Sequence, residues 1–276
     1  MKYVDISSHQ GVVNFQSLKG NVDGVIIRAG YGRNNIDSQF RRNISECNRL
    51  GIPCGVYWFS YAYTETMAAK EAEYMLSAIS DYVVELPVAF DYEYDSVRYG
   101  QKQGVTISAD LVRRMTNAFC QKVEQNKYYC MLYANKDYIN KYFGDLTNKY
   151  DLWYAQYPAA PNPDKPPRSC GIWQWTSKGT VPGIHGYVDV NAVYKDYVSI
   201  IKKAKLNHLP ITDNIPTVNP QVEPTTPVNE TVVPWYTNVM QWGKENGICD
   251  GTRPEDTATR AEVVQMLYNF NQKFLK

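Results

Sequence analysis

Two carboxylates that stand two residues apart, Asp91 and Glu93, are the strongest sign of chemistry in this chain. They end an apolar run over residues 88–94 (VAFDYEY), which is typical of a buried strand. Because side chains alternate between the two faces of a strand, both carboxylates are expected to project to the same side. Such a pair suits glycosidic bond hydrolysis: one carboxyl gives a proton to the leaving oxygen, and the other stays ionised and supports or captures positive charge at the sugar carbon. The alternative is structural, with one acid capping a loop or pairing with Arg98.

The overall composition excludes several other kinds of function. The 276 residues include 29 basic and 28 acidic side chains, and the net charge of +1 gives no reason to expect binding to nucleic acid or to an anionic membrane. No apolar run approaches the roughly 20 residues that a membrane-spanning helix needs. Residues 1–5 are typical of a strand and not of a signal peptide, so we expect synthesis in the cytoplasm without the general secretion route.

The cysteines and histidines give no sign of a metal site or a cofactor. The six cysteines are scattered without a C-x-x-C pair, and the three histidines form neither a metal-ligand spacing nor a Ser-His triad. We therefore expect no metal and no cofactor. The 23 tyrosines and six tryptophans favour sugar binding, since their rings stack while forming hydrogen bonds, although many such rings only fill a core.

A proline-rich segment divides the chain. Residues 209–232 carry five prolines without a helical or strand period, which predicts an extended linker. We therefore expect residues 1–208 to form the main domain and residues 233–276 a small helical one.

Before the linker, eight short runs rich in β-branched and aromatic residues predict strands. They cover residues 3–7, 24–29, 55–61, 88–92, 129–134, 152–156, 171–175 and 186–190. Segments with helical spacing at residues 38–50, 64–80 and 108–125 separate the early runs, which predicts a parallel sheet. The gaps between the last three runs are too short for full helices. The predicted fold is therefore α/β, an irregular eight-stranded barrel with five regular strand–helix units, followed by the small helical domain.

A closed barrel would bring four acids to one rim. Barrel enzymes carry their chemistry at the C-terminal ends of the strands. Asp91 and Glu93 end the fourth predicted strand, Asp5 lies in the first, and Asp189 lies in the last, which closure places beside the first. Clustered acids repel one another unless some are protonated or hydrogen-bonded, which raises the pKa of the most desolvated one. We predict that this acid is Glu93.

Short motifs follow one another in a specific order along residues 2–205. They are DISSHQG (5–11), VIIRAGYG (25–32), GVYWFSY (55–61), D-x-E (91–93), LYAN (132–135), LWYAQY (152–157), WQW (173–175) and VDVN (188–191). No single segment is decisive, whereas the ordered set is highly specific. This set resembles the lysozymes of glycoside hydrolase family 25, the Chalaropsis type: DISSHQG is similar to the family's start, and D-x-E matches its acid pair.

The resemblance implies a (β/α)5(β)3 TIM-like barrel that acts as an N-acetylmuramidase. Such an enzyme cuts the β-1,4 bond between N-acetylmuramic acid and N-acetylglucosamine in bacterial peptidoglycan. Glu93 would be the proton donor, and Asp91 would either steady the positive charge or orient the substrate's N-acetyl oxygen as an internal nucleophile. Asp5 and Asp189 match the family's other two acids, expected to hold substrate and tune the pair, with structural hydrogen bonding at the barrel mouth as the alternative.

Candidates for binding the glycan lie near the expected C-terminal ends of the strands. They are Tyr61, Tyr133, Asn135, Tyr157 and Trp175. Each aromatic ring could equally fill the core, and Asn135 could equally cap a turn. Arg28 could neutralise the acids or form a structural pair, and we favour the structural role.

Residues 233–276 predict two helices and resemble a single surface-layer homology (SLH) repeat. The resemblance rests on Trp235-Tyr236, on NGI at residues 246–248, on Gly251, and on TRAE at residues 259–262, which has the spacing of a capping box. The predicted buried side of the second helix consists of Val263, Met266, Leu267 and Phe270.

A single repeat departs from known surface-layer anchors, which use three repeats to hold anionic cell-wall polymer. The tail would therefore either trimerise or make a weaker, different contact. Arg260 is the candidate contact with the polymer, or else a surface residue beside Glu262.

Together these features predict a peptidoglycan hydrolase of the phage endolysin kind, held in the host cytoplasm until it is released to the cell wall. Its expected partners are peptidoglycan glycan strands, an anionic secondary wall polymer, and further copies of its own tail. A bacterial autolysin is the biological alternative. The chemical alternatives are a chitinase and an idle wall-binding barrel, and the intact Asp91 and Glu93 argue against the idle barrel.

Overall fold

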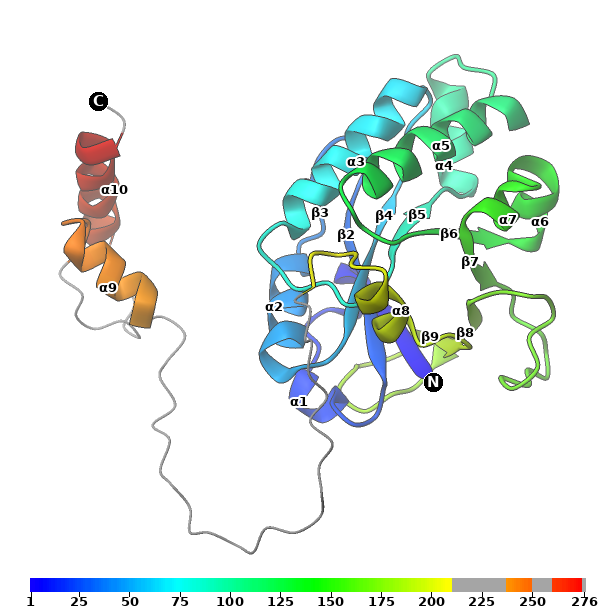
Figure 1. Ribbon diagram of the computed structural model, residues 1–276, viewed down its shortest axis with the longest axis horizontal. Helices are drawn as coiled ribbons and strands as arrows, with labels where there is room; N and C mark the ends of the chain where they lie inside the picture. Colours follow the sequence, from blue (N-terminus) through cyan, green and yellow to red (C-terminus); the bar gives the residue numbers. More distant parts are fainter. Residues whose placement is uncertain (210–236, 250–259, 275–276) are drawn as a thin grey trace, which may run out of the picture. The chain divides into compact units, whose positions relative to one another are not determined.

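The structure is a computed structural model that describes residues 1–209, 237–249 and 260–274 (Figure 1). The chain divides into two compact units, Met1–Ile215 and Pro216–Lys276. Of the predicted linker, only Leu209 is among the described residues, and it is buried in the first unit. None of the helices in these three ranges is long and apolar enough to span a membrane.

The first unit is a closed barrel of eight strands, which confirms the predicted fold class. Each strand pairs with its neighbours in chain order, and the first strand pairs with both the second and the last, which closes the ring. The strands are β1 (Lys2–Ile6), β2 (Gly24–Tyr31), β4 (Cys54–Phe59), β5 (Val88–Asp91), β6 (Cys130–Asn135), β7 (Asp151–Ala155), β8 (Ile172–Gly179) and β9 (Val188–Val193). A short strand, β3 (Asn35–Ile36), only extends β2 as a hairpin.

The last strand runs against the others. The first seven barrel strands are parallel, whereas β9 is antiparallel to both β8 and β1. The sequence predicted that β9 lies beside β1 but did not predict its direction. A parallel connection needs a crossover of about a dozen residues or more, and the residues between β8 and β9, 180–187, form no helix.

Helices cover the outside of the barrel between the strands (Figure 1). The longest are α2 (Phe40–Leu50), α3 (Glu65–Ile79) and α5 (Ala109–Gln125), which match the three predicted helical segments. The hydroxyls of Thr64 and Ser108 cap α3 and α5 by accepting backbone N–H groups. The shorter elements are η1 (Ser8–Gln10), α1 (Phe15–Leu18), α4 (Tyr94–Lys102), α6 (Lys136–Tyr138), η2 (Ile139–Phe143), α7 (Leu146–Lys149) and α8 (Tyr197–Lys203).

Alternation along the strands produces two separate cores. On β2, Val25 and Ile27 belong to the outer core between strands and helices, whereas Ile26 belongs to the core inside the barrel. The inner core also holds Ala89 of β5 and Ile172 of β8. Farther along the strands, towards their C-terminal ends, the inward positions change from apolar to charged and polar residues, and this change creates the site.

The second unit contains two described helices, α9 (Thr237–Glu245) and α10 (Arg260–Phe274). The predicted buried side of α10 is wrong for three of its four residues, because Val263, Leu267 and Phe270 are exposed, whereas Met266 is half-buried. Two helices offer too little surface to cover a full apolar stripe. The capping position Thr259 and the side chain of Arg260 lie outside the described residues.

Candidate active site

A cavity of about 260 Å³ at the C-terminal ends of the parallel strands is lined by four acids. We call it the acid cavity. Asp5 comes from β1, Asp91 is the last residue of β5, and Glu93 stands two residues after Asp91. Asp189 stands near the start of β9 and pairs with Asp5 across the sheet, because the antiparallel strand begins at the rim where the others end. The structure therefore brings together the four acids that the sequence singled out.

Asp5 is held by two amide side chains. Its Oδ2 atom accepts hydrogen bonds from Gln174 Nε2 at 2.9 Å and from Asn191 Nδ2 at 2.8 Å. The Asn191 amide is oriented in turn, since its oxygen accepts from Trp153 Nε1 at 2.7 Å. Burial, and then the charge of Asp189, raises the pKa of Asp5 to about 8, while the two amide donors oppose that shift.

Two tyrosines orient the other amide. The phenol of Tyr133 donates to Gln174 Oε1 at 2.9 Å, and the phenol of Tyr157 donates to the same oxygen at 2.6 Å. With its oxygen occupied, Gln174 must turn its NH₂ group towards Asp5. The sequence prediction missed Gln174 and Asn191. Their inward positions on β8 and β9 follow from strand alternation, but their bonds to Asp5 do not.

Asp91 presents an oxygen without a partner. The side chain is only 4% exposed, and no described group forms a hydrogen bond to its Oδ1 atom. Burial raises the pKa of Asp91, and the neighbouring charges of Glu93 and Asp5 raise it further, whereas Arg28 lowers it. A buried acceptor without a donor is costly, so this oxygen is suited to a hydrogen bond or charge contact from a bound molecule.

Glu93 stands at the junction between strand and helix. It is the N-cap residue of α4, and its backbone N–H donates to the Ser96 hydroxyl at 3.0 Å. Burial raises the pKa of Glu93 to about 7, with smaller contributions from the charges of Asp189 and Asp95. Glu93 therefore occupies a capping position, as the structural alternative predicted, and it also holds a proton near neutral pH, as an acid catalyst requires. Arg98 pairs with Asp95 instead.

The prediction that Glu93 is the most desolvated acid is wrong. Asp5 and Asp91 are 6% and 4% exposed, whereas Glu93 is only half-buried. The reason is position: Asp5 and Asp91 lie within strands, while Glu93 lies just beyond the end of β5.

The raised pKa of Glu93 makes the stability of the fold depend on pH. In the folded state the Glu93 carboxyl has a pKa of about 7, whereas its ordinary pKa is 4.5. The stability contributed by the protonated carboxyl is therefore complete below pH 4.5 and is lost as the pH rises through 7. Glutamine does not titrate. We expect Glu93→Gln to unfold at nearly the wild-type free energy at pH 4.5 but to be about 1–2 kcal/mol more stable at pH 8.

Thermal unfolding of both proteins at these two pH values measures this difference. If the difference in unfolding free energy between Glu93→Gln and wild type is the same at pH 4.5 and pH 8, Glu93 is not desolvated in the folded protein.

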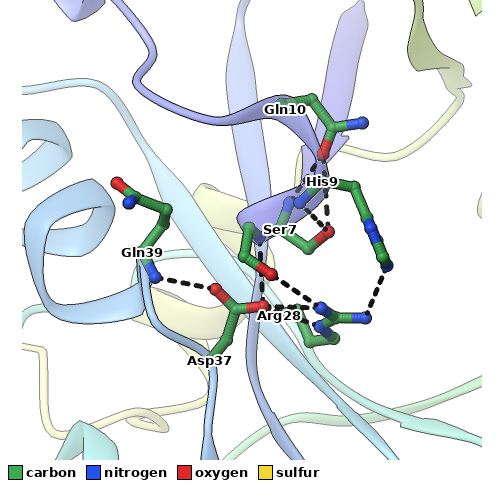
Figure 2. A network of polar contacts seen from close by, with 7 residues as sticks. Ser7, His9, Gln10, Arg28, Asp37 and Gln39 are labelled. Carbon is green, nitrogen blue, oxygen red and sulfur yellow. Dashed lines mark hydrogen bonds and ion pairs between the residues drawn. The ribbon is translucent and has the colours of Figure 1, made fainter.

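Among the described residues, Arg28 is the one cation that lines the acid cavity, and a network of polar contacts holds its guanidinium in place (Figure 2). Its guanidinium forms an ion pair with Asp37 at 2.7 Å and donates to the Ser8 hydroxyl at 3.1 Å. Asp37 also accepts the backbone N–H groups of Ser8 at 3.0 Å and Gln39 at 2.9 Å. Burial alone would raise the pKa of Asp37, but these two donors and Arg28 outweigh it and lower the pKa. Arg28 therefore has the structural pair that we favoured, and it faces the acids as well.

The predicted glycan-binding residues fall into three places. Tyr133 and Tyr157 line the acid cavity and, together with Asn135, an adjoining pocket of about 390 Å³. Asn135 also caps α6 by accepting the backbone N–H of Tyr138 at 2.9 Å. Tyr61 lines a different pocket of about 560 Å³ on the same rim.

Trp175 lies away from these cavities. It packs against the outer core, because it stands next to the inward-facing Gln174 on β8 and therefore points to the opposite face. In the described part of the chain, no group of three or more His, Cys, Asp or Glu side chains could hold a metal ion.

A barrel with this carboxylate pair at its C-terminal rim, one of the two holding a proton near neutral pH, has the site of a glycoside hydrolase. The chain belongs to glycosyl hydrolases family 25, whose model matches residues 4–184. The second unit lies beyond that match.

Three known proteins illustrate the similarity. The chain is 30% identical over 193 residues to an autolytic lysozyme of Clostridium acetobutylicum, a match that covers 69% of this chain and 55% of that protein. It shares 30% identity and a TM-score of 0.60 with the modular autolysin LytC of Streptococcus pneumoniae, solved with a synthetic peptidoglycan ligand, over 70% of this chain and 46% of that one. For the CTP1L endolysin the values are 27% identity and a TM-score of 0.61, over 73% and 69%. The chain thus spans about half the length of the first two proteins.

Proposed function

We propose that this protein is a peptidoglycan hydrolase, an N-acetylmuramidase that cuts the β-1,4 bond between N-acetylmuramic acid and N-acetylglucosamine. The observation that carries the proposal is the shared cavity of Glu93, whose pKa is raised to about 7, and Asp91, whose buried oxygen lacks a partner. Family membership and the similarity to an autolytic lysozyme, an autolysin and an endolysin support it.

In the proposed reaction, protonated Glu93 gives its proton to the glycosidic oxygen as the bond to the sugar carbon breaks. Asp91 either stabilises the positive charge on that sugar or orients the N-acetyl group whose oxygen attacks the carbon. The Glu93 carboxylate then accepts a proton from the water molecule that completes hydrolysis, so the acid is regenerated. Asp189 raises the pKa of Glu93, and Asp5 is held beside it by the amides of Gln174 and Asn191.

Product analysis tests the proposed bond. Purified peptidoglycan is digested, the new chain ends are reduced with borohydride, and the products are identified by mass spectrometry. We expect reduced muramic acid ends. Reduced glucosamine ends would show the opposite bond to be cut, cleavage of chitin oligomers would favour a chitinase, and the absence of products would favour an idle barrel.

We further propose that the protein acts at the bacterial cell wall after release from the cell in which it is made, as a phage endolysin or a bacterial autolysin. We propose the C-terminal unit as an SLH-like module that binds anionic wall polymer, with Arg260 as its contact, or that self-associates. Cosedimentation with walls before and after removal of the polymer, with wild type and Arg260→Gln, tests this role. Equal binding in all four cases would exclude it.

A further inference from the structure

A basic pocket lies beside the acid cavity on the same rim of the barrel. We use this name for the cavity of about 560 Å³ whose walls come from the β2–β3 hairpin, the residues after β4, and helix α4. The side chains that matter for its chemistry are three tyrosines and three cations: Tyr31, Tyr61, Tyr99, Arg33, Arg98 and Lys102.

Two contacts connect the basic pocket to the acid cavity. The Arg28 guanidinium carbon lies 5.6 Å from the centre of the Tyr31 ring, and the ring centres of Phe59 and Tyr61 are 5.2 Å apart. Arg28 and Phe59 line the acid cavity, whereas Tyr31 and Tyr61 line the basic pocket. The two cavities are therefore neighbours, and a branched molecule could occupy both at once.

The basic pocket has an excess of positive charge. Arg98 is neutralised by its ion pair with Asp95. Arg33 and Lys102 are exposed, and neither has an acidic partner within the described residues. An anionic group would therefore be attracted to these two cations.

The tyrosines give the pocket a defined wall. Tyr61 packs edge-on against Tyr31, with ring centres 6.4 Å apart, and against Tyr99, with ring centres 5.2 Å apart. Gly32 permits this packing, because a Cβ atom there would lie 3.1 Å from the Tyr61 ring. The result is an apolar wall with phenol groups next to two free cations, which suits a peptide with carboxylate groups better than a neutral sugar.

We infer that the basic pocket binds the carboxylates of the peptide stem that peptidoglycan carries on its muramic acid residues. The inference rests on the proposed function, which places a stem-bearing sugar in the acid cavity beside this pocket. The phosphates of a wall polymer share the same anionic chemistry, and a substrate without that polymer separates the two sources. The enzyme would thus prefer peptide-bearing glycan to bare glycan.

The test compares two substrates and three proteins. The substrates are polymer-free peptidoglycan and the same glycan after an amidase has removed its stems. The proteins are wild type, the pocket variant Arg33→Gln/Lys102→Gln, and the control Lys127→Gln/Lys203→Gln. The control removes two exposed lysines near the opposite end of the barrel. Lys127 lies just before the start of β6, and Lys203 is the last residue of α8, which follows β9.

We expect the ratio of kcat/KM on peptide-bearing glycan to that on bare glycan to fall about 10-fold in the pocket variant, mainly through KM, and to stay at the wild-type value in the control. An unchanged ratio in the pocket variant would overturn the inference. A lower rate on both substrates alike would assign the pocket to sugars. Walls that keep their polymer serve as a third substrate, and an effect seen on them alone would assign the pocket to phosphate. Both results also overturn it.

A binding measurement separates this inference from the proposed function. A soluble disaccharide-tetrapeptide and the bare disaccharide are titrated into the full chain by calorimetry. Wild type is expected to bind the disaccharide-tetrapeptide more tightly than the bare disaccharide, and loss of this difference in the pocket variant supports the inference. If that difference is lost but no glycan is cut by wild type, only the proposed function fails. Equal affinity for the two ligands in wild type overturns the inference even if glycan is cut.

Discussion

Replacing Glu93 with glutamine is expected to lower kcat/KM on peptidoglycan by about 10³-fold or more. Glutamine matches glutamate in shape and can occupy the same position at the start of α4. Its amide holds no acidic proton for the leaving oxygen and cannot accept one from water afterwards. The measurement is the rate at which reduced muramic acid ends appear at pH 6, where the Glu93 carboxyl, with a pKa of about 7, is mostly protonated.

The matched control is Glu124→Gln, which makes the same chemical change at an exposed position of α5. It is expected to keep the wild-type rate. Circular dichroism establishes that Glu93→Gln is folded. A folded variant with wild-type activity would remove Glu93 from the role of acid and would assign that role to another acid of the cavity.

The barrel could be predicted from the sequence because its signals are local. Each strand is a short β-branched or aromatic run, and two of the three long helices, α3 and α5, begin at the hydroxyl caps Thr64 and Ser108. The direction of β9 is not local. It depends on how residues 180–187 connect two strands, and no residue type in that segment specifies the outcome. That direction nevertheless decides which end of β9 carries Asp189 to the rim.

The acids of the site could be predicted because their spacing and their strand positions are visible in the sequence. The groups that hold Asp5 could not, since Gln174 and Asn191 lie 169 and 186 residues away from it. The prediction for Trp175 fails for another reason. Its position near a strand end suggested a place in the glycan groove, but a shift of one residue along a strand turns the side chain to the other face of the sheet.

The basic pocket shows why charge alone could not reveal a second site. The chain as a whole is almost neutral, with a net charge of +1. Only the fold places the β2–β3 hairpin beside α4, so that Arg33 and Lys102 meet in one pocket while four acids gather next to it. Separation of charge across a rim is a property of the tertiary structure and has no signature in composition.

Replacing Asp91 with asparagine is expected to lower kcat/KM by about 10²-fold or more while the protein stays folded. Asparagine keeps the shape of the side chain and an oxygen that can accept a hydrogen bond, but it carries no negative charge. Asp91 is buried and lacks a partner for one oxygen, so no other contact depends on that oxygen. Steady-state rates on peptidoglycan measure the loss, and Asp81→Asn, at an exposed position two residues after the end of α3, is the matched control.

The two roles open to Asp91 predict different results with a modified substrate. If Asp91 orients the N-acetyl group as the internal nucleophile, wild type should lose activity on N-deacetylated glycan to about the same extent as Asp91→Asn does on normal glycan, and the two losses should not add. If Asp91 stabilises the positive charge directly, deacetylation should cost wild type little, and Asp91→Asn should stay impaired on both substrates. Full activity of Asp91→Asn on normal glycan would contradict both roles, because neither can operate without the charge that the carboxylate brings into the cavity.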